Sequence, residues 1–582
     1  GAWAREMNRV DMPVKAGKQV ISSVTGSSSN RANPFVMLFR QDTTEQSGLC
    51  YGFHLLYSGN HYECAEVNAY GKTRFAAGIN PAGFSWHLAP GESFETPQSA
   101  MTVSGQGFTG MSHQMHAFIN THIVRGKWKN RIRPVLLNSW EAAYFDIDER
   151  KLLKLAQKAK EAGIELFVMD DGWFGKREND KSSLGDWFAD KKKLPDGLEG
   201  ICKKVNALGL DFGIWVEPEM INVDSDLYRA HPDWAIKTDK YEPTQGRNQL
   251  VLDLTNPDVV EYLINTMTDV FRYGHIEYIK WDYNRQLSDI FSHRKDARSG
   301  EFFHRFTMGL YELWGALTER FPEILFESCS SGGNRFDLGI LCYCPQIWAS
   351  DNTDAISRAD IQEGYSYGYP MNAVTAHVSS CPNHQTLRQT SLETRFDVAL
   401  FGVLGYECNL SDMSKAELEA IGAQIALYKQ WREVLQLGDF YRIETGNVQK
   451  WICVSSDKRR AVGMVLQRLV RPNWQHEDFR AAGLDESLRY HFYSLPGKFD
   501  IRDFGDLVNT VSPVHIKQGS LTHNVLAKFV TLPREVEDMI VSGGVLMGHG
   551  VKLAPAYSGT GYNEKTRHFQ DFSSRLYFME AI

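Results

Sequence analysis

The sequence predicts an α/β protein built around a (β/α)₈ barrel, with a β domain before it and another after it. Three observations predict this fold. Apolar strand-like runs alternate with helical stretches between residues 131 and 440. Polar residues gather at the C-terminal end of strand after strand, as they do at the rim of such a barrel. The flanking regions show short β-type runs separated by Gly, Asn and Pro. An open doubly wound sheet is the alternative, but it does not need eight units and usually has a glycine-rich first turn.

The first segment, residues 1–130, is predicted to be part of a β-sandwich followed by a linker helix. Its β-type runs are "PFVMLFRQ", "GLCYGFHLLYSG" and "FSWHLAPG". The stretch "GQGFTG" matches the GxGxxG pattern, but a dinucleotide site needs that pattern inside a βαβ unit. We therefore interpret it as a glycine turn that leads into a helix around "MSHQMHAFINTHIV".

The middle segment, residues 131–440, is predicted to be the barrel. Its strand candidates are residues 131–140, 164–173, 210–220, 249–256, 277–284, 323–333, 345–354 and 371–379. Helical stretches lie between several of them, such as "DERKLLKLAQKAKEAG", which has apolar residues at helical spacing. Eight strand–helix units in series favour a closed barrel.

The last segment, residues 441–582, is predicted to be an antiparallel β domain without a catalytic constellation. The runs that indicate strands are "YRIETGNVQKWICVSS", "RRAVGMVLQRLV", "LRYHFYSL", "VLMGHGVKL" and "SRLYFMEAI".

Composition excludes several classes of function. The 582 residues carry a net charge of −8 and no basic stripe, so we expect no nucleic-acid partner. The nine cysteines are scattered, without CxxC or zinc-ligand spacing, which indicates reduced thiols in a cytoplasmic protein. No apolar run of about 18 residues and no signal peptide are visible, so we expect no membrane span. No metal-ligand motif or P-loop is present, and we expect neither metal nor cofactor.

The predicted rim is rich in carboxylates and tryptophans. The polar residues at the strand ends are Trp140, Asp170, Asp171, Trp215, Glu217, Glu219, Asp282, Cys329, Ser331, Asp351 and His377. Paired carboxyl groups without a metal, beside aromatic faces, suit glycoside hydrolysis. That chemistry needs one carboxyl group that is ionised and one that is protonated, so their environments must separate their pKa values.

Asp282 in "YIKWDYNR" is the candidate nucleophile. Lys280 lies two residues earlier and so faces the same side of the strand, where an ammonium favours the ionised aspartate. The alternative is a structural Lys–Asp pair at the end of a strand.

Asp351 and Asp354 in "WASDNTD" are the candidate general acids. Either lies at a strand end, but "SDNTD" is also typical of an Asx-turn or a helix N-cap. We expect one of them to be the acid and the other to be such a cap.

Six motifs together resemble the microbial α-galactosidases of glycoside hydrolase family 36. They are "LFVMDDGWFGKR", "LGDWFADKKKLPDGL", "FGIWVEPEMI", "YIKWDYNR", "FESCSSGGNRFDLG" and "QIWASDNTDAI". The resemblance implies an N-terminal β-supersandwich, here shorter than usual, a catalytic (β/α)₈ barrel and a C-terminal β domain. It also implies a retaining double displacement that releases terminal α-galactose from small oligosaccharides such as raffinose or melibiose. The family forms oligomers, which use N-terminal residues, and we expect a homo-oligomer here without a fixed number of subunits.

The resemblance implies roles for individual residues. Asp282 matches the nucleophile and Asp351 the acid/base, while Asp170 and Asp171 match the pair that binds the galactose 4- and 6-hydroxyls. Further sugar contacts are implied for Lys280, Asn284, Arg247, Trp215, Trp140 and, near the 2-hydroxyl, Cys329 and Ser331. Trp281 is expected to pack outward between strand and helix.

One departure from the family pattern keeps other functions open. Ser331 stands where the family often has glycine, so it either contacts the 2-substituent or narrows the pocket there.

Four functions are the alternatives to an α-galactosidase: an α-N-acetylgalactosaminidase, which needs room at that 2-position, a galactosyl transferase of the raffinose-synthase kind, an inactive sugar-binding protein and a metal-dependent barrel hydrolase.

Overall fold

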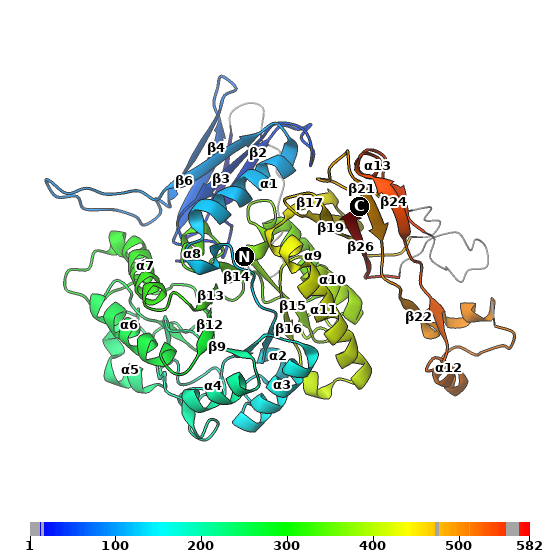
Figure 1. Cartoon of the computed structure of the whole chain (residues 1–582). Coiled ribbons are helices and arrows are strands. Elements are labelled where there is room, and N and C mark those ends of the chain that lie inside the picture. Colours follow the sequence, from blue (N-terminus) through cyan, green and yellow to red (C-terminus); the bar gives the residue numbers. More distant parts are fainter. Residues whose placement is uncertain (1–11, 13–16, 472–476, 511, 555–569) are drawn as a thin grey trace. The chain divides into compact units, whose positions relative to one another are not determined.

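The computed structural model describes residues 12, 17–471, 477–510, 512–554 and 570–582 (Figure 1). The chain divides into two compact units. One comprises Gly1–Gln389 and Ala399–Gln430, and the other comprises Thr390–Val398 and Trp431–Ile582.

The first unit contains a closed barrel of eight parallel strands, which confirms the predicted fold class (Figure 1). In chain order these strands are β7 (Leu136–Asn138), β8 (Leu166–Met169), β9 (Asp211–Val216), β12 (Ile276–Trp281), β13 (Leu325–Ser328), β14 (Gln346–Trp348), β15 (Val374–Ser379) and β16 (Val403–Glu407). Nearly all of their side chains are buried, as expected for parallel strands covered by helices.

The prediction of a barrel strand within residues 249–256 is wrong. Those residues contain β11 (Leu250–Val251), which pairs antiparallel with β10 (Met220–Ile221) in the connection between β9 and β12. The missing barrel strand is β16, whose run carries Gly405. A Cβ at that glycine would come within 2.5 Å of the His377 ring on neighbouring β15, so close packing excludes any side chain there.

Helices alternate with the barrel strands and lie on the outside of the barrel in Figure 1. They are α2 (Trp140–Ala143), α3 (Glu149–Ala162), α4 (Gly197–Ala207), α5 (Asp226–Ala230), α6 (Pro257–Phe271), α7 (Phe302–Arg320), α8 (Leu338–Leu341), α9 (Ala355–Tyr365) and the part of α11 (Lys415–Leu437) up to Gln430. Residues 392–398 of α10 (Leu392–Ala399) belong to the second unit. Helix α3 shows how the sequence defines such an element. The Asp148 side chain accepts a hydrogen bond from the Lys151 N–H at its start, and Gly163 ends it in the left-handed conformation.

The N-terminal part of this unit forms two antiparallel sheets, ordered β1-β4-β5 and β2-β3-β6. The strands are β1 (Gly17–Ser22), β2 (Phe35–Phe39), β3 (Cys50–Leu55), β4 (His61–Val67), β5 (Thr73–Ile79) and β6 (Ser99–Ser104). The run "FSWHLAPG" is irregular rather than a strand. The "GQGFTG" stretch leads from β6 into helix α1 (Gly107–Phe118), as predicted.

The second unit contains a six-stranded antiparallel sheet in the order β17-β18-β19-β26-β21-β24. These strands are β17 (Asp439–Glu444), β18 (Val448–Val454), β19 (Arg460–Gln467), β21 (Arg489–Tyr493), β24 (Asp538–Ser542) and β26 (Ser573–Ala581). The run "VLMGHGVKL" differs from the prediction, because it forms helix α13 (Gly543–Gly548) and the short strand β25 (Val551–Lys552). One cluster of buried apolar side chains, including Ile452 and Phe492, forms the core on this sheet.

Within the described ranges, no helix combines the length and the apolar character that a membrane span requires. All nine cysteines of the chain lie in those ranges, and none of them is joined in a disulfide there.

Candidate active site

A cavity of about 380 Å³ opens at the C-terminal ends of the barrel strands. All the residues to which the family resemblance assigns roles line it: Trp140, Asp170, Asp171, Trp215, Arg247, Lys280, Asp282, Asn284, Cys329, Ser331 and Asp351. Glu219, His377 and Asp354 do not. The barrel therefore brings together residues that are up to about two hundred positions apart in the sequence.

Asp282 directly follows β12 and is held on both carboxylate oxygens. Oδ1 accepts the N–H of Tyr283 at 2.8 Å, and Oδ2 accepts Nδ2 of Asn284 at 2.6 Å and Nε1 of Trp215 at 3.2 Å. Burial works to raise the pKa of Asp282, but the charge of Lys280 and the hydrogen-bond donors outweigh it and lower this pKa below its ordinary value. This carboxyl group is kept ionised, as a nucleophile must be.

Asp351 lies just beyond β14 and is partly exposed to the same cavity. Its Oδ1 accepts Nε1 of Trp348 at 3.0 Å. Loss of solvent and the negative charge of Asp282 raise its pKa to about 6. The two carboxyl groups thus have pKa values displaced in opposite directions, which is the arrangement that separates a base from an acid.

Asp354 caps a helix instead of reaching the cavity. Its side chain accepts the Ser357 N–H at 3.0 Å, at the start of α9, and it pairs with Arg388. One of the two aspartates is therefore a cap, as the sequence pattern predicted.

The ammonium of Lys280 bonds to a different aspartate from the one expected. Its Nζ lies 2.8 Å from Oδ2 of Asp170, which also accepts Nδ2 of Asn138 at 2.7 Å. Although burial opposes the charge, the Asp170 carboxylate raises the pKa of Lys280 well above its usual value. Lys280 therefore acts on Asp282 through space rather than through a hydrogen bond.

Asp171 is clamped by Arg177, which the sequence reasoning missed. Nε and Nη2 of Arg177 donate to the two carboxylate oxygens at 3.0 and 2.8 Å. Both side chains are buried, and the two parallel hydrogen bonds fix the orientation of the carboxylate. Arg177 follows Asp171 by six residues in the "MDDGWFGKR" motif, so a basic residue in the loop after the paired aspartates was the available signal.

Asn284 links Asp282 to the cavity rim. Its Nδ2 donates to Asp282, while its Oδ1 accepts Nη1 of Arg247 at 2.6 Å and Oγ of Ser331 at 2.9 Å. Ser331 has a φ of 47°, in the left-handed region that favours glycine. The serine that departs from the family pattern is therefore strained, and its hydroxyl orients the Asn284 amide.

Trp281 points away from the cavity, as expected. Its ring packs against the ring of Trp314 on α7, with 4.1 Å between the ring centroids, and its Nε1 donates to Oε1 of Glu219 at 2.9 Å. Cys329, by contrast, is buried beside Asp282 and shares a hydrogen bond with it.

Further residues line the cavity that the sequence reasoning did not select as site residues: Glu141, Arg177, Glu217, Gln249, Trp348, Thr353, His384, Gln385 and Glu407. Glu407 ends β16, the strand missed from the sequence, and pairs with His377 at 3.0 Å. Glu217 was visible at the end of the third predicted strand, but nothing in the sequence distinguished it from Glu219.

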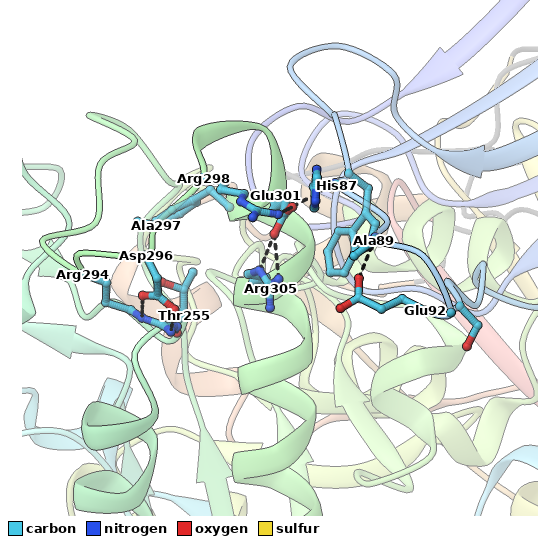
Figure 2. Close-up of a pocket in the computed structure, with 14 residues that line it drawn as sticks. His87, Ala89, Glu92, Thr255, Arg294, Asp296, Ala297, Arg298, Glu301 and Arg305 are labelled. Atoms are coloured by element: carbon cyan, nitrogen blue, oxygen red, sulfur yellow. Dashed lines mark hydrogen bonds and ion pairs between the residues drawn. The ribbon is translucent and has the colours of Figure 1, made fainter.

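A second cavity of about 670 Å³ lies between residues 86–93 and the region from Arg294 to Arg305 (Figure 2). Its charged side chains satisfy one another. Arg305 and Arg298 pair with Glu301, and Arg294 pairs with Asp296. It is larger than the barrel cavity but offers no pair of carboxyl groups with opposed pKa shifts, so the barrel cavity is the candidate active site.

Across the part of the chain that the structure describes, no group of three or more His, Cys, Asp or Glu side chains is arranged to hold a metal ion.

Family models match almost the whole chain. The Glycosyl hydrolase family 36 N-terminal domain matches residues 1–89, Melibiase matches residues 93–438, and the Glycosyl hydrolase family 36 C-terminal domain matches residues 448–579.

Curated relatives and solved structures agree with these matches. The chain is 46% identical to Alpha-galactosidase AgaA of Geobacillus stearothermophilus over 85% of its own length and 68% of the relative's. It is 45% identical to Alpha-galactosidase Mel36A of Lactobacillus acidophilus over 84% of its length and 67% of that relative's.

The crystal structure of AgaA superimposes with a TM-score of 0.88 at 41% identity, covering 100% of this chain and 74% of that one. A variant of AgaA in complex with raffinose matches with the same TM-score and coverage at 40% identity. With three domain models in order and relatives at this level of identity, the chain belongs to glycosyl hydrolase family 36.

Proposed function

We propose that this chain is a retaining α-galactosidase that releases terminal α-linked galactose from small oligosaccharides such as raffinose and melibiose. The observation that carries the proposal is the pair of carboxyl groups in one cavity. The pKa of Asp282 is lowered, while that of Asp351 is raised to about 6. The names of the relatives and the raffinose bound to AgaA support the choice of sugar.

In the first step, the Asp282 carboxylate attacks the anomeric carbon from the β face. Asp351 gives its proton to the departing glycosidic oxygen, which leaves a β-galactosyl ester on Asp282. In the second step, the Asp351 carboxylate removes a proton from a water molecule, which attacks the same carbon from the α face. Two inversions release α-galactose and restore both carboxyl groups.

Asp170 and Asp171 are proposed to bind the axial 4-hydroxyl and the 6-hydroxyl of galactose. Their orientations are fixed by Lys280 and by Arg177, so little conformational entropy is lost when the sugar binds. Trp140 and Trp215 line the same cavity and offer apolar ring faces, which suit the C–H faces of a sugar.

The decisive experiment is a turnover assay on nitrophenyl α- and β-glycosides of galactose, glucose and N-acetylgalactosamine. We expect the α-galactoside to be strongly preferred. Equal hydrolysis of the α-glucoside would refute the sugar assignment, and preference for the α-N-acetylgalactosaminide would favour that alternative. Product analysis at high sucrose concentration would detect a transferase.

We also propose a cytoplasmic, homo-oligomeric enzyme. Nine cysteines without a disulfide among the described residues support a reducing compartment. The oligomeric state is supported by the family resemblance of the sequence. Light scattering during size-exclusion chromatography measures the number of subunits.

Asp171→Asn is expected to lower kcat/KM for α-galactosides by roughly tenfold or more, because it removes a charge-assisted hydrogen bond worth about 1.5–3 kcal/mol. It also leaves the buried Arg177 without its full countercharge, so kcat/KM is reported per folded enzyme after a thermal unfolding measurement. The matched control is Asp146→Asn, an exposed aspartate, which should stay within about twofold of wild type. An unchanged kcat/KM in Asp171→Asn would remove Asp171 from the sugar site.

The pH profile of the wild type follows from the two pKa shifts. Asp351 must be protonated to act as the acid, so kcat/KM for melibiose should fall as the pH rises through about 6. Asp282 must be ionised, and its lowered pKa places the acid limb below about 3.8. An activated aryl α-galactoside needs little acid assistance, so its alkaline limb should be weaker. A kcat/KM for melibiose that rises between about pH 6 and 8 would contradict the role of Asp351.

A further inference from the structure

Glu217 occupies a position that the two-step mechanism does not use. It follows β9 directly, is 1% exposed, and belongs to the wall of the cavity beside Asp282. The ends of β9 and β12 are fastened together at this point, because the N–H of Asp282 donates to the carbonyl oxygen of Val216 at 2.8 Å. Glu217 is therefore a rigidly placed carboxyl group next to the nucleophile.

One oxygen of Glu217 accepts two hydrogen bonds. Oε1 accepts the backbone N–H of Asn284 at 2.6 Å and Nε2 of Gln249 at 2.8 Å. Both bonds fall on the same oxygen, so neither of them uses Oε2. The short bond to Asn284 fixes the backbone from which the Asn284 amide reaches Asp282.

The orientation of the Asn284 side-chain amide depends on the position of that backbone. Its Nδ2 donates to Oδ2 of Asp282 at 2.6 Å, and its Oδ1 accepts from Arg247 and Ser331. Both ends of the amide are in use, so a displaced backbone would break contacts on the nucleophile and on the rim together. Displacements of about 1 Å in a reacting geometry can cost on the order of 10²-fold in rate.

We propose, resting on the function proposed above, that Glu217 is a positioning residue that holds Asn284 against the Asp282 nucleophile. It does not touch the reacting atoms. It acts through the backbone N–H of Asn284. Removing Glu217 should therefore displace the side-chain amide of Asn284, and should not remove an acid or a base of the reaction.

The protonation state of Glu217 explains how a second carboxyl group is tolerated beside a nucleophile. Burial and the negative charge of Asp282 raise the pKa of Glu217 to about 8, against the opposing charges of Arg247 and Arg177. The other carboxylate on the same segment, Glu219, forms an ion pair with Arg335, in which Nη2 lies 2.7 Å from Oε1. At about pH 6 to 7 Glu217 is therefore mainly neutral, which limits its repulsion of Asp282.

Two variants of Glu217 separate positioning from charge. Glu217→Ala removes the acceptor for Asn284 and should lower kcat/KM per folded enzyme by about 10- to 100-fold. Glu217→Gln keeps a neutral group with one acceptor oxygen and should recover most of that loss, remaining within about fivefold of wild type near pH 6. A Gln variant as poor as the Ala variant would overturn the neutral positioning role.

A double-mutant cycle tests whether the effect passes through Asn284. Asn284→Ala removes the amide that Glu217 positions, so adding Glu217→Ala to it should cost little more, with less than about threefold further loss. If the two fold-changes instead multiply, Glu217 acts independently of Asn284 and the proposal is overturned.

Glu219→Gln is the matched control, since it changes the same residue type two positions along, bonded to Arg335 and Trp281 away from the cavity. It should lower Tm while leaving kcat/KM per folded enzyme within about twofold. An active wild type with an unaffected Glu217→Ala variant overturns this inference alone. A wild type that is inactive on every α-galactoside overturns the proposed function and this inference with it.

Discussion

Asp282→Ala is expected to abolish hydrolysis of α-galactosides, with kcat lowered by roughly 10⁴-fold or more, because no covalent intermediate can form without the nucleophile. The loss should be similar for melibiose and for an activated aryl α-galactoside, since leaving-group assistance does not replace an attacking group. Initial rates on both substrates, with folding checked by thermal unfolding, measure this.

The product that Asp282→Ala forms with azide distinguishes the loss of the nucleophile from general damage to the site. In Asp282→Ala the small anion can enter the space left by the carboxylate and attack the anomeric carbon from the β face, so the product should be the β-galactosyl azide. An α-azide from this variant would show that a nucleophile remains and that Asp282 is not it.

Asp351→Ala is expected to fail in a different way. Hydrolysis of melibiose should fall by about 10²- to 10⁴-fold, because its leaving group needs a proton. The Asp282 carboxylate should still attack an activated aryl α-galactoside well in the first step, and the phenol should be released in a burst. The galactosyl-enzyme should then accumulate, because no base activates water, and mass spectrometry of the quenched enzyme should detect one added galactosyl group.

Azide needs no base and should release that intermediate as the α-galactosyl azide, with retained configuration. Asp354→Ala is the control, because that side chain caps α9. It should lower Tm and leave the kinetic pattern of the wild type. If Asp354→Ala stalls and Asp351→Ala does not, the acid lies three residues further along. The same azide anomer from Asp282→Ala and Asp351→Ala would contradict both role assignments.

The barrel was predictable because parallel strands leave continuous apolar runs and converging polar ends. Six of the eight barrel strands lie within the predicted segments, and a seventh, β12, begins one residue before its segment. The error at residues 249–256 has a physical origin, since a two-residue strand such as β11 and a barrel strand have the same local apolar pattern. Strand β16 was missed because packing against His377 requires Gly405, which weakens the strand pattern.

The site was predictable where chemistry follows from spacing along one strand. Lys280 lies on β12 and Asp282 follows it two residues later, so both side chains face the same side, and their presence in one cavity follows from that period. What spacing could not predict is which charges pair across strands. Lys280 bonds to Asp170 from β8, and Asp171 bonds to Arg177 from the following loop. Such contacts depend on the closure of the barrel, not on local sequence.

The ammonium of Lys280 has consequences for how this enzyme could evolve. It bonds to Asp170, which is assigned to sugar recognition, and it helps to keep Asp282 ionised. A substitution at Lys280 would therefore alter substrate choice and turnover in a single event. Selection for a new sugar would meet a loss of rate at this position, so changes in specificity should arise first at rim positions such as Ser331. Its hydroxyl contacts Asn284, while its bond to Asp282 is made by the backbone N–H, which a substitution keeps.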